Sequence, residues 1–202
     1  MSLSPHQITA LVVATSFAAG LNVYATVATL GLLARAGIVS LPAPLELLTH
    51  DWVIGASVAL YLLEFVADKI PAVDLAWNAL QTFVRVPVAA LLAYGAAMNL
   101  SPGEQLLATA GGGFIAMVAH SGKTAARIAV TPSPEPFSNI ALSLGEDALA
   151  VFVTWLAGRH PVWAAALVVL LLAIIVILAR AVVRALRAMF RGAERQLQAV
   201  FR

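Results

Sequence analysis

Ionisable and polar side chains recur at helical spacing within long apolar stretches of this sequence. Glu64 and Asp68 stand four residues apart, as do Lys123 and Arg127. Steps of three, four or seven residues place side chains on one face of a helix. Together, such residues could bind a small polar solute or an ion. This candidate site comprises Glu64, Asp68, Asn78, Arg85, His120, Lys123, Arg127, Glu146 and Asp147.

The acids and bases of this set predict a paired cluster. Ionised groups inside a bilayer are costly, so they pair with one another or line a water-filled cavity. We expect Arg85 and Arg127 to bond carboxylates on other helices. Pro87 should kink the helix beside Arg85, because proline has no backbone N–H to donate. Two interpretations stay open: a pathway for a solute, ion or proton, and a structural salt-bridge network that holds the helices together.

The tripeptide Gly-Lys-Thr at 122–124 looks like the end of a phosphate-binding loop, but the rest of that motif is missing. The motif needs a glycine where the chain has Met117, and it needs a soluble strand before it. No H-E-x-x-H zinc motif occurs, and the neighbours His120 and Ser121 point about 100° apart on a helix. We therefore name no catalytic residue and no cofactor, and an intramembrane enzyme is a third hypothesis only.

Two further kinds of site find little support in the sequence. Carboxylates could hold a hard cation through oxygen ligands, although no spacing singles out a metal site. No basic patch interleaved with aromatic residues points to nucleic acid. The predicted partners are therefore the bilayer and a small solute or ion.

The composition shows that these charged residues are rare in a strongly apolar chain. Of 202 residues, 61% are hydrophobic and only 11% charged, and the mean hydropathy is +0.93. Soluble domains carry about 25% charged residues, so the sequence predicts an integral membrane protein. The chain has no cysteine, which excludes disulfides, thiolate metal sites and a cysteine nucleophile. The start "MSLSPHQIT" lacks a basic region, so the first apolar segment reads as an uncleaved span.

Six segments are long and apolar enough to cross a membrane, which takes about 20 residues. Prolines and glycines mark most of the joints between them, as in "KIP", "SPGE" and "GRHP". The sequence thus predicts an all-α polytopic membrane protein with helices at residues 8–35, 52–68, 75–98, 104–130, 139–155 and 161–190. The last of these lacks polar residues over 162–179, so we expect it to face lipid.

The distribution of basic residues predicts the orientation. Residues 180–202 hold six arginines and one glutamate. By the positive-inside rule this end lies in the cytoplasm, and an even number of spans puts the N-terminus there as well. The protein would then be a multi-pass inner-membrane protein. In that orientation the acids of the second and fifth helices and the bases of the third and fourth converge on the cytoplasmic half.

An internal repeat is suggested by a pattern of arginine, six residues and Pro-x-Pro. It begins at Arg35 and again at Arg127, and Gly20 and Gly112 match at the same offset. Three helices per repeat is an odd number, so the second copy would be inverted in the membrane, as in many transporters. The repeats would cover about 8–98 and 104–190 of a single membrane domain, 1–202.

The matching glycines lie in the small-residue runs "SFAAG" and "TAGGG". Small residues let helix backbones approach closely, so Gly20 and Gly112 predict tight helix crossings. The alternative is an unwound helix whose backbone binds an ion.

The C-terminal arginines recur every three or four residues from Arg180 to Arg195. This spacing predicts a basic amphipathic helix that touches anionic lipid. A solvated tail that only fixes the topology is the alternative. The arginines expected to contact lipid are Arg184, Arg187 and Arg191.

Four phrases together carry a resemblance to a known family: "GLNVY" (20–24), "LEFVADKIPAVDLAWN" (63–78), "HSGKTAAR" (120–127) and "SPEPFSN" (133–139). They resemble a family of small bacterial integral membrane proteins classed as a domain of unknown function. The family has no established activity, so the resemblance implies no catalytic role. The three-plus-three layout is also similar to that of small exporters of amino acids and metal ions.

From these observations we expect a transporter or channel-like protein with a charged site between the second and fifth helices. The alternative is a non-transporting scaffold or anionic-lipid-binding protein whose buried salt bridges are structural. The sequence does not indicate the substrate, the direction of transport or the coupling ion. It also leaves the oligomeric state open, and a homo-oligomer is one of the alternatives.

Overall fold

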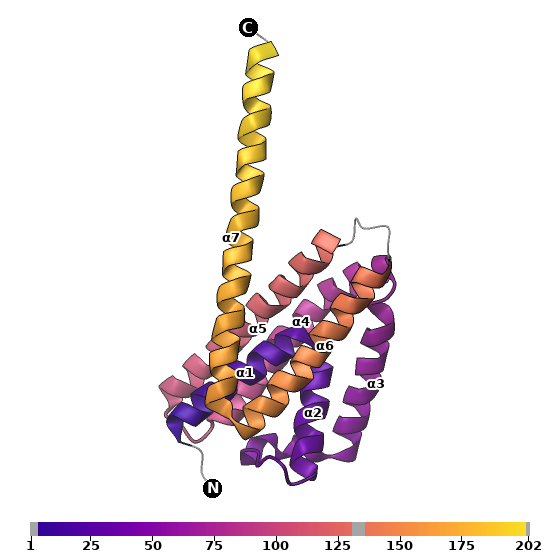
Figure 1. Ribbon diagram of the computed structural model, residues 1–202. Helices are drawn as coiled ribbons and strands as arrows, with labels where there is room; N and C mark the ends of the chain where they lie inside the picture. The colour runs from indigo at the N-terminus through magenta and orange to yellow at the C-terminus, as the bar shows by residue number, and fades with distance from the viewer. Residues whose placement is uncertain (1–3, 131–135, 201–202) are drawn as a thin grey trace. The chain divides into compact units, whose positions relative to one another are not determined.

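The computed structural model describes residues 4–130 and 136–200, and in these ranges every regular element is helical. The predicted all-α class is thereby confirmed for the described chain. The chain divides into two compact units, Met1–Val168 and Val169–Arg202, and each is considered by itself. The elements are α1 (Pro5–Leu21), α2 (Val23–Arg35), η1 (Ala43–Thr49), α3 (Asp51–Ala67), α4 (Pro71–Ala97), α5 (Pro102–Val130), α6 (Pro136–Arg159) and α7 (Pro161–Val200) (Figure 1).

Proline sets where most helices begin. Five of the described helices start at a proline, at the position where its missing N–H would have no helical partner. The prolines of "KIP", "SPGE" and "GRHP" are therefore helix starts. Helices α4 and α5 begin at Pro71 and Pro102, before the predicted starts at 75 and 104, whereas α7 begins at Pro161 as predicted. The loop that contains Pro134, part of the predicted repeat motif, lies outside the described residues. Pro87 lies inside α4, which continues through it as one helix.

The first predicted helix, residues 8–35, was wrong as a single element. It is two helices, α1 and α2, separated at Asn22, whose backbone is extended with φ −151° and ψ 103°. Apolar residues continue on both sides, so periodicity does not reveal the break. The cause is local, since the Asn22 side chain accepts a hydrogen bond from the Ala25 N–H at 2.9 Å and so begins α2.

The sequence predicts six helices that span the membrane, but fewer of the observed helices are long and apolar enough to do so. Among the described residues, three helices have the length and apolar character to cross a bilayer, in α4, α6 and α7. The number rises to four if η1 and α3, which bend by 65° at their junction, count as one span. The break at Asn22 leaves α1 and α2 with only 17 and 13 residues. The apolar helices are those of a membrane protein, as the composition predicted.

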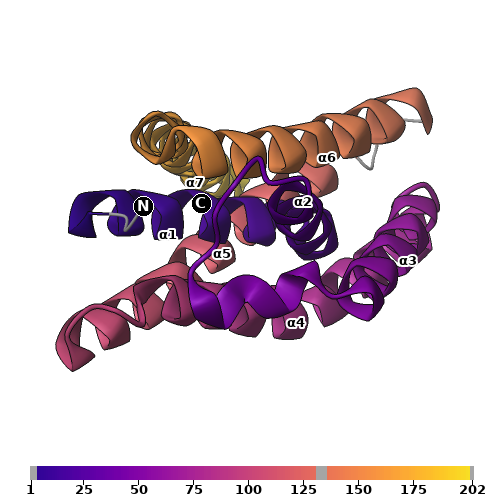
Figure 2. The same ribbon diagram turned by 90° about the horizontal axis from the view of Figure 1, so that it is seen from below.

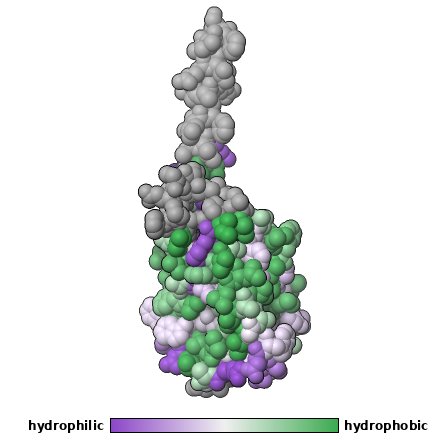
Figure 3. Space-filling model, turned by 90° about the vertical axis from the view of Figure 1, so that its right-hand side faces the viewer, coloured by the Kyte–Doolittle hydropathy of each residue, from purple (hydrophilic) through white to green (hydrophobic). Residues whose placement is uncertain are grey.

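In the first unit, α1 lies at the centre. Its residues from Ala10 to Leu21 are almost all buried, and it contacts α4, α5 and α6. Helix α2 contacts both α3 and α6 and lies between them (Figure 2). The hydropathy of this unit is reversed relative to a soluble protein. Leucine, phenylalanine and tryptophan side chains are exposed while charged side chains are buried, and mostly hydrophobic residues cover the face seen in Figure 3.

The two matching glycines lie at helix crossings. A Cβ on Gly20 would lie 2.5 Å from the Ala116 carbonyl oxygen, so α1 and α5 touch backbone to backbone. A Cβ on Gly112 would lie 2.5 Å from the Ala93 Cβ and 2.8 Å from the Ser16 Oγ. Only residues without a side chain fit at such distances. Both glycines thus lie at close helix crossings, and the helix that contains Gly20 ends at Leu21, directly before the break at Asn22.

The second unit is helical from Val169 to Val200. Apolar side chains such as Ile177 are exposed along it, followed by exposed Arg184 and Arg187. The Arg184 Nε donates to the Arg180 carbonyl at 3.3 Å. The side chain of Arg191 lies outside the described part of the chain.

Candidate functional site

All nine residues of the candidate site are buried in the first unit, with exposed fractions between 0% and 8%. They come from four helices and one helix cap. Glu64 belongs to α3 and Asp68 caps its C-terminus. The others are Asn78 and Arg85 of α4, His120, Lys123 and Arg127 of α5, and Glu146 and Asp147 of α6.

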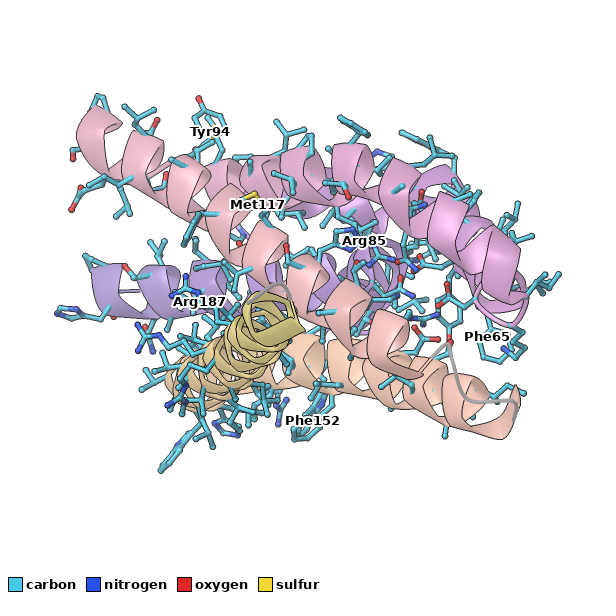
Figure 4. The ribbon with its side chains drawn as sticks, turned by 90° about the horizontal axis from the view of Figure 1, so that it is seen from above. Phe65, Arg85, Tyr94, Met117, Phe152 and Arg187 are labelled. Atoms are coloured by element: carbon cyan, nitrogen blue, oxygen red, sulfur yellow. The ribbon has the colours of Figure 1, made fainter. Side chains whose placement is uncertain are left out.

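Glu64 and Arg85 form the first ion pair of the cluster. Both side chains are fully buried, and the Arg85 Nη2 donates to the Glu64 Oε1. The Lys123 Nζ approaches the same oxygen at 3.2 Å. One carboxylate oxygen therefore lies between two cations from α4 and α5. In Figure 4, Arg85 lies between the helices, whereas Tyr94 and Phe152 point outward.

The second group of ion pairs has Arg127 of α5 at its centre, and it joins the C-terminal end of α3 to α6. The Arg127 Nη2 lies 2.7 Å from both the Asp68 Oδ2 and the Glu146 Oε2. The Lys123 Nζ adds weaker approaches of 3.6 Å to Asp68 and 3.4 Å to Glu146. Lys123 thus links the two pairs into one network that ties these helices together.

His120 is held in one tautomer by its neighbours. The Arg85 Nη1, which can only donate, lies 3.1 Å from the His120 Nδ1. That nitrogen must therefore accept, and the proton lies on Nε2. Nε2 faces the Asn78 carbonyl at 3.1 Å and the Thr82 Oγ1 at 2.9 Å. These contacts assign a neutral His120 between α4 and α5.

The end of α1 enters the same network. The last carbonyls of a helix have no helical partner and carry partial negative charge. The Arg85 Nη1 donates to the Gly20 carbonyl at 3.2 Å, and the Lys123 Nζ donates to the Leu21 carbonyl at 3.2 Å. Two buried cations therefore cap α1 at the point where the chain breaks.

Asp147 differs from the other acids of the cluster. Its Oδ1 accepts a hydrogen bond of 2.9 Å from the Asn22 Nδ2. Within residues 4–130 and 136–200, no lysine or arginine lies within ion-pair distance of it. Its nearby polar groups include the Tyr61 hydroxyl and the Lys69 ammonium, which both interact with its carboxylate. Asp147 is nevertheless only 4% exposed.

Two residues that contact the cluster, Asn22 and Ser143, are not among the nine predicted site residues. Asn22 links the helix break to Asp147, and Ser143 donates to the Asp68 Oδ2 at 3.3 Å. One signal could have found Asn22. A run of 28 residues from Ile8 to Arg35 exceeds the roughly 20 that a straight span needs, and asparagine is a preferred first cap of a helix. For Ser143 the signal is helical spacing, because it stands three residues before Glu146 and four before Asp147.

The arrangement does not form a metal site among the described residues. No group of three or more histidine, aspartate and glutamate side chains is placed to hold an ion there. The reason is that lysine and arginine side chains lie between the carboxylates, and cations bring like charge to any metal.

Replacing Asn22 by alanine should destabilise the first unit by about 2 kcal/mol. The change removes the cap of α2, worth about 1 kcal/mol, and leaves the Asp147 Oδ1 buried without a donor. Asn22→Ser is the matched control, because serine retains a capping oxygen but lacks the amide donor, and it should lose about half as much. Thermal unfolding in detergent measures both, and an Asn22→Ser variant as stable as the parent would show that the bond to Asp147 contributes nothing.

Comparison with known proteins adds one result. Neither a curated protein nor a solved structure matches the chain. A family profile does match, over residues 9–181, and that range includes every residue of the buried cluster. The chain therefore belongs to the family described as a domain of unknown function, DUF4126.

Proposed function

We propose that the protein moves a small polar solute or an ion across the inner membrane, through the buried cluster between α3 and α6. One observation carries the proposal. Glu64, Asp68 and Glu146 each keep one buried carboxylate oxygen that lacks a donor among the described residues. A buried acceptor without a partner costs about 1–3 kcal/mol, and more when it is charged. Water, a proton or a solute that donates hydrogen bonds would satisfy these oxygens.

The break between α1 and α2 supports the same proposal. Many transporters bind their substrates at the ends of discontinuous helices, where backbone groups are free to take part. Here the carbonyls of Gly20 and Leu21 and the cap residue Asn22 all contact the cluster. Arg85 and Lys123 occupy the carbonyls in this structure, so a solute would have to displace or rearrange them.

The proposal includes a topology of six spans. In it, α1 and α2 together form the first span, and α3 to α7 form the other five, with both termini in the cytoplasm. The two halves would be inverted repeats. In support, Gly20 and Gly112 each occupy a tight crossing, although α5 has no break that corresponds to Asn22. The basic part of α7, with Arg184, Arg187 and Arg191, would lie against anionic lipid.

A second candidate is a non-transporting scaffold or lipid-binding protein. It is favoured by the direct pairing of Arg85, Lys123 and Arg127 with carboxylates. Buried ion pairs can hold helices in one arrangement without conducting anything.

Flux measurements distinguish the two candidates. The protein in liposomes should conduct protons, potassium ions or a zwitterionic amino acid such as glycine above the rate of protein-free liposomes. Glu64→Gln should return that flux to background, because the amide removes the charge that faces Arg85 and Lys123. Glu46→Gln, on the exposed surface of η1, is the control and should conduct like the parent. Background flux of every probe by folded parent protein would reject transport and leave the scaffold.

A further inference from the structure

Helix α7 is longer than a membrane span requires. It runs from Pro161 to Val200 as one helix of 40 residues (Figure 1), of which the 24 residues Pro161–Arg184 are apolar enough to cross a bilayer. At 1.5 Å per residue this span measures about 36 Å, more than the roughly 30 Å of a hydrocarbon core. The remaining residues, 185–200, therefore continue the helix for about 24 Å beyond the hydrocarbon.

The sequence gives α7 no place to bend after the span. Sharp kinks in helices arise at proline, at glycine–serine pairs or at π-bulges. Residues 185–200 contain no proline and no serine, and the structure describes them as part of one α-helix. A helix that does not bend leaves the bilayer instead of lying along its surface. The apolar residues of 185–200 therefore need a cover other than lipid.

These apolar residues recur with the period of a coiled coil, which has apolar residues at positions a and d of a seven-residue repeat. With residue 183 at position a, six apolar residues occupy every a and d position from 183 to 200. This seam consists of Val183, Leu186, Phe190, Ala193, Leu197 and Val200. Its first residue, Val183, is 45% exposed. Over its described residues, 169–200, the second unit is a single helix, so it has no neighbour of its own to cover the seam.

The charged residues of α7 fit the same register. From 180 to 200 the five arginines and Glu194 all fall at positions b, e or f, outside the seam. In a parallel pair of helices, position e of one faces position g of the other. The g positions here are Val182, Met189 and Gln196. Because none of these is charged, arginines at position e meet no like charge across the seam, and those nearest the span can still contact anionic lipid.

We propose that the seam pairs with the same seam of a second copy of the chain, as a parallel two-stranded coiled coil beyond the hydrocarbon. Two copies that share one orientation in the membrane present their C-terminal helices in parallel. A twofold axis along the pair, the commonest symmetry of oligomers, then brings each seam residue against its own counterpart. Confinement to the same membrane raises the effective concentration of the partner, which favours pairing along a short seam. The inference goes beyond the proposed function and does not require flux.

Cysteine cross-linking tests this pairing in the full chain, which has no cysteine of its own. Three alanines provide matched positions: Ala193 at d in the seam, and Ala188 at f and Ala199 at c outside it. Each is replaced by cysteine in turn, and the protein is oxidised in liposomes at a high ratio of lipid to protein. Ala193→Cys should form disulfide-linked dimers at least about tenfold faster than the other two, because a disulfide needs Cα atoms within about 7 Å.

A charge placed in the seam should separate the pair. Leu197→Glu puts a carboxylate of each copy opposite the other at position a, where the two repel and lose their hydration. Added to Ala193→Cys, it should lower the rate of cross-linking to that of Ala188→Cys. Gln198→Glu is the control, since it adds the same charge one residue later, at the outer position b. It should leave the rate of Ala193→Cys unchanged.

Three results would overturn the inference. Equal rates for the three cysteines would show chance collisions and not a seam. No cross-link at any of them would mean that lipid or a different protein covers the apolar face. Equal effects of Leu197→Glu and Gln198→Glu would mean that any added charge separates the chains. The flux assay is a separate measurement, because single chains can conduct and paired chains can fail to conduct.

Discussion

Replacing Arg85 by leucine is expected to destabilise the protein by about 3–5 kcal/mol, because removal of one partner leaves a buried charge uncompensated. Glu64 and Arg85 are both fully buried, and Arg85 also donates to the Gly20 carbonyl and to His120. Lys123 alone would then face Glu64 at 3.2 Å. Thermal and denaturant unfolding in detergent measure the loss.

Arg35→Leu is the matched control for this change. Arg35 pairs with Asp51, but their side chains are 49% and 86% exposed. Water screens such a pair, so its removal should cost less than about 1 kcal/mol. The double change Arg85→Leu with Glu64→Leu should recover much of the loss, because it removes both charges. If Arg85→Leu unfolds like the control, Glu64 does not depend on Arg85 for its compensation.

Gly20→Ala is expected to destabilise the protein by about 3 kcal/mol, at the upper end of overpacking effects. The new methyl group would lie 2.5 Å from the Ala116 carbonyl oxygen and 2.8 Å from the Ala116 Cα. Both atoms belong to the backbone of α5, so no side-chain rotation relieves the contact, and α1 must move away from α5. Thermal unfolding in detergent measures the effect.

Two adjacent glycines in α5 provide the control. A Cβ on Gly112 would meet Ala93 and Ser16 within 2.8 Å, whereas a Cβ on Gly111 would meet nothing within 4 Å. Gly112→Ala should therefore destabilise, while Gly111→Ala should stabilise by up to about 1 kcal/mol through helix propensity. Destabilisation by both changes would mean that glycine acts there through the backbone and not through a close crossing.

The sequence predicts the helices of this protein better than it predicts their ends. The all-α class follows from the apolar runs, and the start of α7 follows from Pro161, but α4 and α5 begin at Pro71 and Pro102, before the predicted 75 and 104. The break at Asn22 does not follow, because apolar residues on both sides hide a change that only one side chain and one backbone conformation create. With the break missed, two short helices were predicted as one span.

For the candidate site, too, the sequence predicts some features and leaves others to the packing of the helices. Helical spacing predicts which charges share a face, and the cost of burying charge predicts that they pair. Which acid meets which base depends on the crossing of α5 over α1 and α4, and no local pattern encodes that geometry. The spacing therefore grouped Glu146 and Asp147, although only Glu146 forms an ion pair with the bases of α5. The open groove lined by Tyr61 and by the α6 residues Asp147 and Trp155 likewise joins two helices, α3 and α6, that are far apart in the sequence.

The order of the charges along the chain has a consequence for how the protein is made. Glu64 and Arg85 are 21 residues apart on the consecutive helices α3 and α4. Arg127 and Glu146 are 19 residues apart on α5 and α6. Each pair of neighbouring helices therefore brings its own counter-ion as it leaves the ribosome. A chain that enters the bilayer two helices at a time never exposes either of these carboxylates to lipid alone. Asp68, by contrast, meets its cations only when α5 brings Lys123 and Arg127.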